Sequence, residues 1–194
     1  MWRRRETTME PEFKAFDKIA RLNREVIVTE KIDGTNALVW VSDDGTEIRA
    51  GSRSRWIAVG DDNFAFAGWV EKNRDELLRL GPGYHYGEWW GAGIQRRYGL
   101  TEKRFSLFNV SRWSDDATRP ACCHVVPVLA RGLDIRATTD EAMATLRENG
   151  SIAAPGFDKP EGVVVFHTAS SSLFKVTLDG DEAPKSAFRG EVRS

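Results

Sequence analysis

Residues 26–41 read VIVTEKIDGTNALVWV, and the expected architecture follows from this stretch. Its apolar residues alternate at the start, a two-residue period that predicts a strand, and Asp33-Gly34 predicts a turn at its end. The same period places Lys31 and Asp33 on one face. A lysine beside an acid and a glycine is compatible with a solvated hairpin residue and with a catalytic nucleophile, so the choice depends on the rest of the chain.

The composition describes an ordinary globular protein. With 194 residues, 41% of them hydrophobic and 29% charged, the chain is expected to form a single domain over residues 1–194. Its net charge of −1 gives no overall attraction to nucleic acid, so any such binding must use local patches. No run approaches the roughly 18 apolar residues of a membrane helix, and the basic start lacks the apolar segment of a signal peptide. Adjacent Cys122 and Cys123 suit neither a disulfide nor a zinc site, which favours the reducing cytoplasm.

Short segments of strand and helix character alternate along the chain. Beyond the first strand, further strands are expected at residues 36–42, 46–50, 84–89, 105–110, 125–129, 162–166 and 173–178. Helices are expected at residues 61–80 and 138–149, and the spacing of Phe13, Phe16, Ile19 and Leu22 predicts a short helix near the start. Because most strands are neighbours in sequence, the pattern predicts an α+β fold with antiparallel sheets flanked by helices.

Three later stretches carry polar residues in apolar surroundings. Glu88 lies in residues 84–99, YHYGEWWGAGIQRRYG, Glu161 precedes the apolar run GVVVF, and Lys175 lies within LFKVTL. Each has an ordinary structural explanation: a hairpin of packed tryptophans, solvation of a strand end, or a lysine that reaches solvent from a sheet edge. The segment GAGIQR is a weak phosphate loop, since the third glycine of the dinucleotide motif is missing.

Taken together and in this order, the stretches resemble the covalent nucleotidyltransferase superfamily of ATP-dependent ligases and capping enzymes. Lys31-Ile32-Asp33-Gly34 resembles its nucleophile motif, and Glu88 in GEWWGAGIQ resembles its third motif. The run EKIDGTN, with Asn36 where DNA ligases and capping enzymes usually have arginine, is most similar to the RNA ligases that seal nicks in duplex RNA. The resemblance covers residues 26–178 and implies the ligase adenylation domain.

The resemblance implies a role for each matching residue. Lys31 is the nucleophile and Lys175 belongs to the fifth motif, where Thr177 replaces the usual second lysine. The residues expected at the nucleotide are Glu30, Ile32, Asp33, Gly34, Asn36, Arg53 on the ribose, Glu88, Phe108 stacked on adenine, and Glu161 of the fourth motif. Asp33, Glu88 and Glu161 are also expected at a Mg²⁺ or Mn²⁺ site, partly through metal-bound waters.

A lysine that attacks a phosphate must be neutral, although ammonium groups of lysine ordinarily titrate near 10.4. Crowding by a second cation favours the neutral amine, and Lys175, expected to be buried in the same pocket, together with the metal would supply it. The implied reaction uses ATP to form a lysyl-AMP, passes AMP to a 5′-phosphate end, and joins that end to a 3′-hydroxyl. The expected partners are RNA ends, nicked or single-stranded, with no membrane and no obligate protein partner.

Other functions remain open from the sequence. They are a DNA ligase, a capping-type nucleotidyltransferase, and a non-catalytic protein that binds nucleic-acid ends on the same fold. Only sixteen residues follow Leu178, so no separate C-terminal RNA-binding domain is expected. The basic clusters that could contact RNA instead are Arg3–Arg5, Arg96-Arg97, Lys103-Arg104, Lys185 and Arg189.

Overall fold

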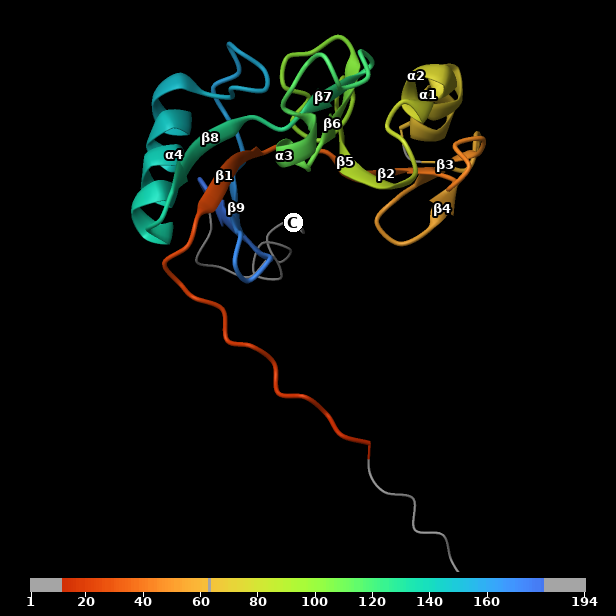
Figure 1. Ribbon diagram of the computed structural model, residues 1–194. Helices are drawn as coiled ribbons and strands as arrows, with labels where there is room; N and C mark the ends of the chain where they lie inside the picture. The colour runs from red at the N-terminus through yellow and green to blue at the C-terminus, as the bar shows by residue number, and fades with distance from the viewer. Residues whose placement is uncertain (1–11, 63, 180–194) are drawn as a thin grey trace, which may run out of the picture.

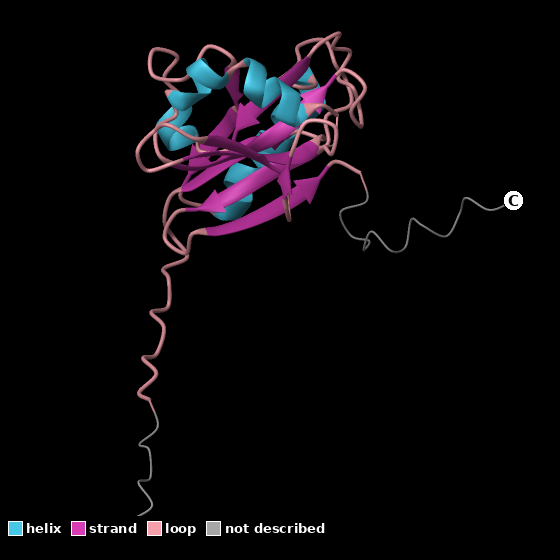
Figure 2. Ribbon diagram, turned by 90° about the vertical axis from the view of Figure 1, so that its right-hand side faces the viewer, coloured by secondary structure: helices cyan, strands magenta, loops and turns pink. Residues whose placement is uncertain are grey.

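The computed structural model describes residues 12–62 and 64–179 of the chain. The strands in this part form a four-stranded and a six-stranded sheet, called sheet A and sheet B below. Figure 2 shows the strands gathered in the middle of the molecule with the helices around them. This architecture confirms the α+β class expected from the sequence.

Sheet A has the strand order β10-β9-β1-β8, and all its neighbouring strands are antiparallel. Its strands are β1 (Val26–Lys31), β8 (Val128–Gly132), β9 (Gly162–His167) and β10 (Ser172–Thr177). Helix α4 (Ile135–Asn149) covers one face, where its apolar residues pack against Val26 and Val28. This helix begins three residues earlier than expected because the Asp134 carboxylate caps it, accepting a 2.8 Å hydrogen bond from the Ala137 backbone N–H.

Sheet B has the strand order β4-β3-β2-β5-β6-β7. Its strands are β2 (Thr35–Val41), β3 (Ile48–Gly51), β4 (Trp56–Ile57), β5 (Gly83–Gly91), β6 (Lys103–Leu107) and β7 (Cys123–Val125). Helices α1 (Phe66–Lys72) and α2 (Arg74–Leu78) lie above β2 and β3 in Figure 1, and a helical turn, α3 (Val110–Trp113), follows β6. The other neighbouring strands of sheet B are antiparallel as expected, and the β6–β7 pair at one edge is parallel.

The turn after β1 carries the chain from one sheet to the other. Residues 32–34 separate β1 of sheet A from β2 of sheet B. A buried cluster that includes Ile27 of β1, Ile32 of the turn and Trp90 of β5 joins the two sheets behind this turn. The segment that carries Lys31 and Asp33 is therefore held between sheet A and sheet B.

Two expected elements are divided in the structure. The helix expected over residues 61–80 is divided into α1 and α2 at Asn73, whose backbone leaves helical geometry with φ −106° and ψ 20°. The Asn73 side chain donates a 2.8 Å hydrogen bond to the Trp69 carbonyl at this point. The strand expected over residues 125–129 is interrupted by Pro127, which has no N–H for a ladder. Its first part ends β7 in sheet B, and its second part begins β8 in sheet A.

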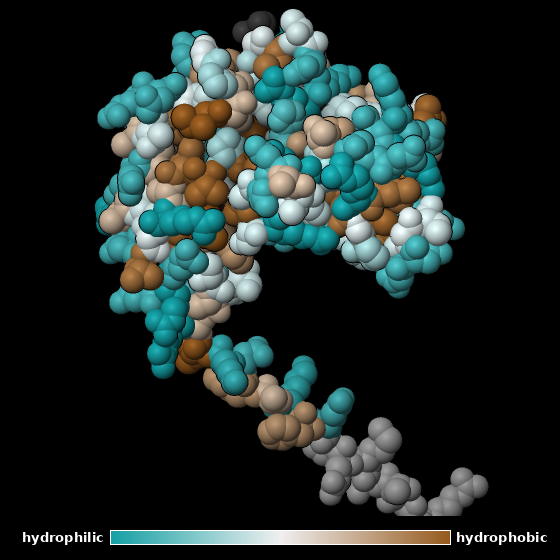
Figure 3. Space-filling model, turned by 45° about the horizontal axis from the view of Figure 1, so that its top comes forward, coloured by the Kyte–Doolittle hydropathy of each residue, from teal (hydrophilic) through white to brown (hydrophobic). Residues whose placement is uncertain are grey.

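The helix expected around Phe13–Leu22 was wrong for the described residues 12–25. This segment contains no helix, and its four large apolar side chains are 68–90% exposed. Figure 3 shows it leaving the body of the molecule with apolar and polar side chains along it. Helical spacing alone does not stabilise a short helix that has no surface to pack against. No helix in the described part of the chain is long and apolar enough to cross a membrane.

Candidate active site

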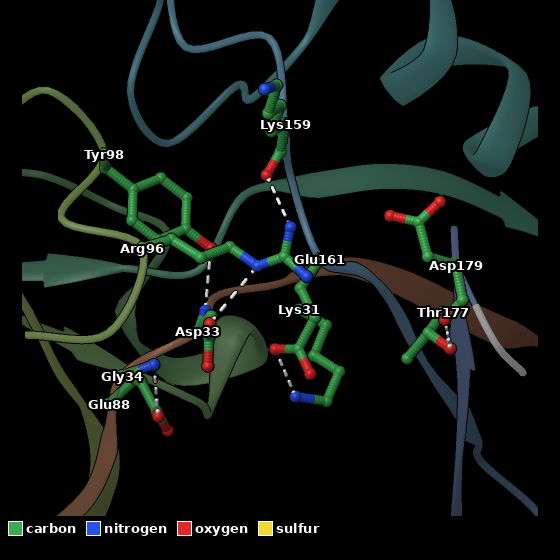
Figure 4. A network of polar contacts seen from close by, with 10 residues as sticks. All are labelled: Lys31, Asp33, Gly34, Glu88, Arg96, Tyr98, Lys159, Glu161, Thr177 and Asp179. Carbon is green, nitrogen blue, oxygen red and sulfur yellow. Dashed lines mark hydrogen bonds and ion pairs between the residues drawn. The ribbon is translucent and has the colours of Figure 1, made fainter. Parts of the chain in front are cut away.

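Lys31 ends β1 and lies beside Glu161. The ammonium nitrogen Nζ is 2.5 Å from Glu161 Oε2, and the two side chains are 23% and 12% exposed. Glu161 stands one residue before β9, whose Gly162 pairs with Lys31 across the ladder. The pairing of β1 with β9, two strands distant in sequence, therefore brings Lys31 and Glu161 together (Figure 4).

Asp33 is held by the loop that follows β5. Its backbone N–H donates a 2.7 Å hydrogen bond to the Tyr98 hydroxyl, and its carboxylate lies 3.2 Å from Arg96 Nε. Arg96 Nη1 also donates to the Lys159 carbonyl at 3.0 Å, two residues before Glu161. Arg96 thus bridges the Asp33 turn and the segment that carries Glu161, as Figure 4 shows.

The geometry of this loop depends on unusual backbone conformations. Gln95, Arg97 and Tyr98 all have positive φ, between 43° and 60°, in the left-handed region that non-glycine residues seldom adopt. Tyr98 is buried against Trp90, with ring centroids 4.9 Å apart, and burial raises the pKa of its hydroxyl. Such strain persists only where the surroundings enforce it, and here the buried Tyr98 ring and its hydrogen bond from the Asp33 N–H anchor the loop.

Glu88 approaches the same turn from β5. Its Oε1 accepts a 3.1 Å hydrogen bond from the Gly34 N–H. Burial raises the pKa of Glu88 to about 7, and Lys31 and the Gly34 hydrogen bond oppose this rise. Gly34 itself is tightly enclosed, since a Cβ there would lie 2.5 Å from the Trp89 carbonyl oxygen. Only glycine therefore fits this position without a shift of the backbone.

Other expected nucleotide residues are placed by strand register. Asn36 pairs with Glu88 across β2 and β5, so the two lie side by side on one face of sheet B. Phe108 follows β6, is 41% exposed, and donates its backbone N–H to the Tyr86 carbonyl. Arg53 is exposed in the turn between β3 and β4. Their contacts with nucleotide stay predictions.

Glu30 and Ile32 point away from Lys31. The carboxylate of Glu30 is 1% exposed and accepts hydrogen bonds from the Ser151 hydroxyl and from the backbone N–H groups of Ile152 and Ala153. Burial raises the pKa of Glu30 against the opposing effect of these hydrogen bonds. Ile32 lies in the buried cluster between the sheets. For both residues, only the backbone can take the predicted role at the nucleotide.

Lys175 differs from the expectation of a buried lysine. Across sheet A it aligns with Val164 and Thr29, two register positions from the row of Thr177, Gly162 and Lys31, so it shares the Lys31 face. It is nevertheless exposed, because β10 is the edge strand. The expectation that Lys175 is buried was therefore wrong.

The carboxylates expected at a metal site are engaged with protein donors. Glu161 pairs with Lys31, Asp33 with Arg96, and Glu88 with the Gly34 N–H. Within residues 12–62 and 64–179, no three His, Cys, Asp or Glu side chains converge as metal ligands. The oxygen donors are of the type that Mg²⁺ and Mn²⁺ prefer, but they do not form a metal cage in this arrangement.

The basic clusters behave differently from one another. Arg96, expected to contact RNA, is tied to Asp33, whereas its neighbour Arg97 is exposed. Lys103 donates to the Phe64 carbonyl, and Arg104 pairs with Glu102. Arg3–Arg5, Lys185 and Arg189 lie outside the described residues. Sequence reasoning missed Tyr98 altogether, although an aromatic residue in the glycine-flanked run QRRYG was a signal for a packed loop.

Comparison with known proteins shows the family and the fold of this chain. The sequence model of the RNA ligase family matches residues 24–177, and the chain belongs to this family. Solved structures of an RNA ligase from Naegleria gruberi are similar in fold. A glutamate-to-alanine mutant with ATP and Mn is 21% identical, with a TM-score of 0.57 over 81% of this chain and 51% of that chain. For an apo aspartate-to-alanine mutant the values are 20%, 0.57, 87% and 56%.

The same ligase with PPi gives 21% identity and a TM-score of 0.54 over 80% of this chain and 50% of that chain. The present chain therefore spans about half the length of these structures. Among curated proteins, no sequence matches it.

Proposed function

We propose that the chain is an ATP-dependent RNA ligase that acts through a covalent lysyl-AMP. In the first step Lys31 Nζ forms a bond to the α-phosphorus of ATP, the bond to pyrophosphate breaks, and the amine loses its proton. The AMP is then transferred to the 5′-phosphate of an RNA end. Finally an RNA 3′-hydroxyl attacks that phosphate and releases AMP, leaving a phosphodiester bond.

The observation that carries the proposal is the position of Lys31 among three acidic side chains from separate elements. Glu161 at 2.5 Å is placed to orient the amine and to accept the proton that it must lose. Arg96, through the Asp33 carboxylate, and Glu88, through the Gly34 N–H, hold the turn that follows Lys31 and so would fix the amine relative to sheet B. Such positioning supplies much of the rate of phosphoryl-type transfers.

The remaining roles are those that the family resemblance implies, and the placements above are compatible with them. Phe108 would stack on adenine, Arg53 would bind the ribose, and Asn36, beside Glu88, would orient the activated 5′-phosphate. Lys175, exposed on the Lys31 face, would meet the phosphates rather than crowd the amine. Related structures were solved with ATP and Mn. A divalent ion bound with ATP would offset the phosphate charge, and Asp33, Glu88 and Glu161 offer suitable oxygens.

Self-labelling tests the proposal directly. The protein is incubated with ATP labelled at the α-phosphate and Mg²⁺ or Mn²⁺, then denatured and assayed for covalent label. Label is expected on the wild-type chain and on Lys72→Ala, an exposed lysine in the last turn of α1, and is expected to be absent from Lys31→Ala. A phosphoramidate is labile in acid and stable in alkali. Full labelling of Lys31→Ala would refute the assignment.

The same assay separates the other candidates. A protein that only binds RNA ends would give no covalent adduct, and a capping-type enzyme would label with GTP. The expected partners are RNA ends, with no obligate protein partner. The free thiols of Cys122 and Cys123 support the proposal of a cytoplasmic protein.

A further inference from the structure

Sheet B presents an uncovered aromatic face. Its four rings, called the aromatic face below, belong to Trp40, Trp56, Tyr84 and Tyr86. The two tyrosines are each 58% exposed and Trp56 is 46% exposed. In Figure 1, α1 and α2 lie on the upper side of β2 and β3, and no helix of the described chain lies on the lower side.

Strand register puts these rings together. Tyr84 pairs with Trp40, and two residues further along each strand Tyr86 pairs with Leu38. Leu38 also pairs with Gly51, which pairs in turn with Trp56, so the second row continues across β3 and β4. His85, which lies between Tyr84 and Tyr86 on β5, points to the opposite, buried face of sheet B.

The rings also contact one another. The rings of Tyr84 and Tyr86 are nearly parallel, with centroids 6.4 Å apart and an interplanar angle of 13°. Trp40 meets Trp56 edge to face at 6.3 Å, and the Arg49 guanidinium lies 5.8 Å from the centre of the Trp40 ring. Arg49 is exposed, and its ion pair with exposed Glu47 is long at 3.9 Å, so its charge remains available to an anion.

The aromatic face continues into the candidate active site. Asn36 and Glu88 form the next row on the same face, two residues from Leu38 and Tyr86 and therefore roughly 7 Å away. Phe108, expected at adenine, borders Tyr86 through their backbone hydrogen bond. An RNA strand bound along the aromatic face would therefore lead towards the candidate active site.

The chemistry of the face favours one occupant. Exposed planar rings with a nearby arginine are the features of a stacking platform for unpaired nucleic-acid bases. The Arg49 cation beside the rings would attract the phosphates of such a strand, and the face runs on into the Asn36 and Glu88 row of the candidate active site. We propose, on the basis of the function proposed above, that the aromatic face stacks the unpaired bases of the RNA strand that is to be joined.

Binding of short RNAs tests this inference. Octameric single-stranded RNA, the same length with abasic residues, and the corresponding duplex are titrated while tryptophan fluorescence and electrophoretic mobility are followed. Single-stranded RNA should bind at least tenfold more tightly than abasic RNA or duplex, because both lack accessible base faces. Tyr84→Leu/Tyr86→Leu should weaken binding of the single strand at least tenfold.

Controls distinguish stacking from other contacts. Tyr84→Phe/Tyr86→Phe keeps both rings and should bind like the wild type, as should Leu133→Ala, which removes an exposed apolar side chain outside sheet B. Circular dichroism verifies that each variant is folded. Equal affinity for abasic and normal RNA, or no loss in the leucine variant, would overturn the inference.

The two proposals can fail separately. Self-labelling with AMP needs no RNA, so it should be unchanged in the leucine variant. Loss of RNA binding with normal labelling supports the stacking face. If labelling is normal and the tyrosine substitutions leave RNA binding unchanged, only the proposal of base stacking on the aromatic face is refuted. If the wild-type protein is not labelled, only the proposed ligase activity is refuted.

Discussion

Replacement of Arg96 by alanine should slow self-adenylylation, although the Arg96 side chain is partly exposed. The change removes the 3.2 Å ion pair with Asp33 and the 3.0 Å hydrogen bond to the Lys159 carbonyl. The two ionic side chains are 32% and 29% exposed, so solvent weakens the pair to about 1 kcal/mol. The hydrogen bond from the charged guanidinium adds about 1.5 kcal/mol. If this support acts on the geometry of the attacking amine, the labelling rate should fall roughly 30-fold to 100-fold.

The assay measures initial rates of AMP labelling across ATP concentrations. Because Arg96 acts through Asp33 and the Glu161 segment, the loss should appear in the rate at saturating ATP more than in the ATP concentration needed. Arg97→Ala is the matched control, since Arg97 is the exposed neighbour, and it should label within about twofold of the wild type. If Arg96→Ala labels normally and loses only strand joining, Arg96 contacts RNA and the positioning argument is refuted.

Three further predictions concern charge and recognition. Burial raises the pKa of Glu88 from 4.5 to about 7, so the folded state loses stability as pH rises across this interval, by about 3 kcal/mol in full. Glu88→Gln should therefore be more stable than the wild type at pH 8 and similar at pH 4.5 in urea unfolding; a constant difference would contradict this. ATP should label at least tenfold better than GTP, about 1.4 kcal/mol, because stacking on Phe108 offers no charged partner for guanine; equal labelling would favour a capping-type enzyme. Labelling should tolerate added salt better than RNA joining, which depends on phosphate contacts, when both are assayed from low to physiological salt; a parallel decline would show that RNA binding does not limit joining.

The local parts of the fold were accessible from the sequence. Alternating apolar residues and the Asp33-Gly34 turn located β1, the turn and β2, because strand period and turn chemistry are properties of neighbouring residues. Lys31, Glu88 and Glu161, singled out from separate stretches of the sequence, lie in one neighbourhood of the structure. Whether their predicted roles at nucleotide and metal hold depends on the experiments above.

The remaining features depend on contacts that the sequence pattern does not encode. The Arg96–Asp33 pair joins residues 63 positions apart through a loop with three left-handed residues, so no local period indicates it. Lys175 is exposed because β10 lies at a sheet edge, which only the strand order reveals. The segment before β1 has helical spacing but no surface to cover, so its period gave a wrong helix.

The pairing of β1 with β9 also determines when Lys31, the proposed nucleophile, acquires its partner Glu161 during synthesis. Sheet B uses consecutive segments between residues 35 and 125, whereas sheet A joins β1 to strands made near the end of the described chain. Lys31 and Glu161 are separated by 130 positions. At translation rates of about 5–20 residues per second, Lys31 waits on the order of ten seconds for Glu161. The last strand of sheet B ends at Val125, before Glu161 is made, so a nascent chain can complete the sheet that carries the aromatic face before Lys31 has its acidic partner.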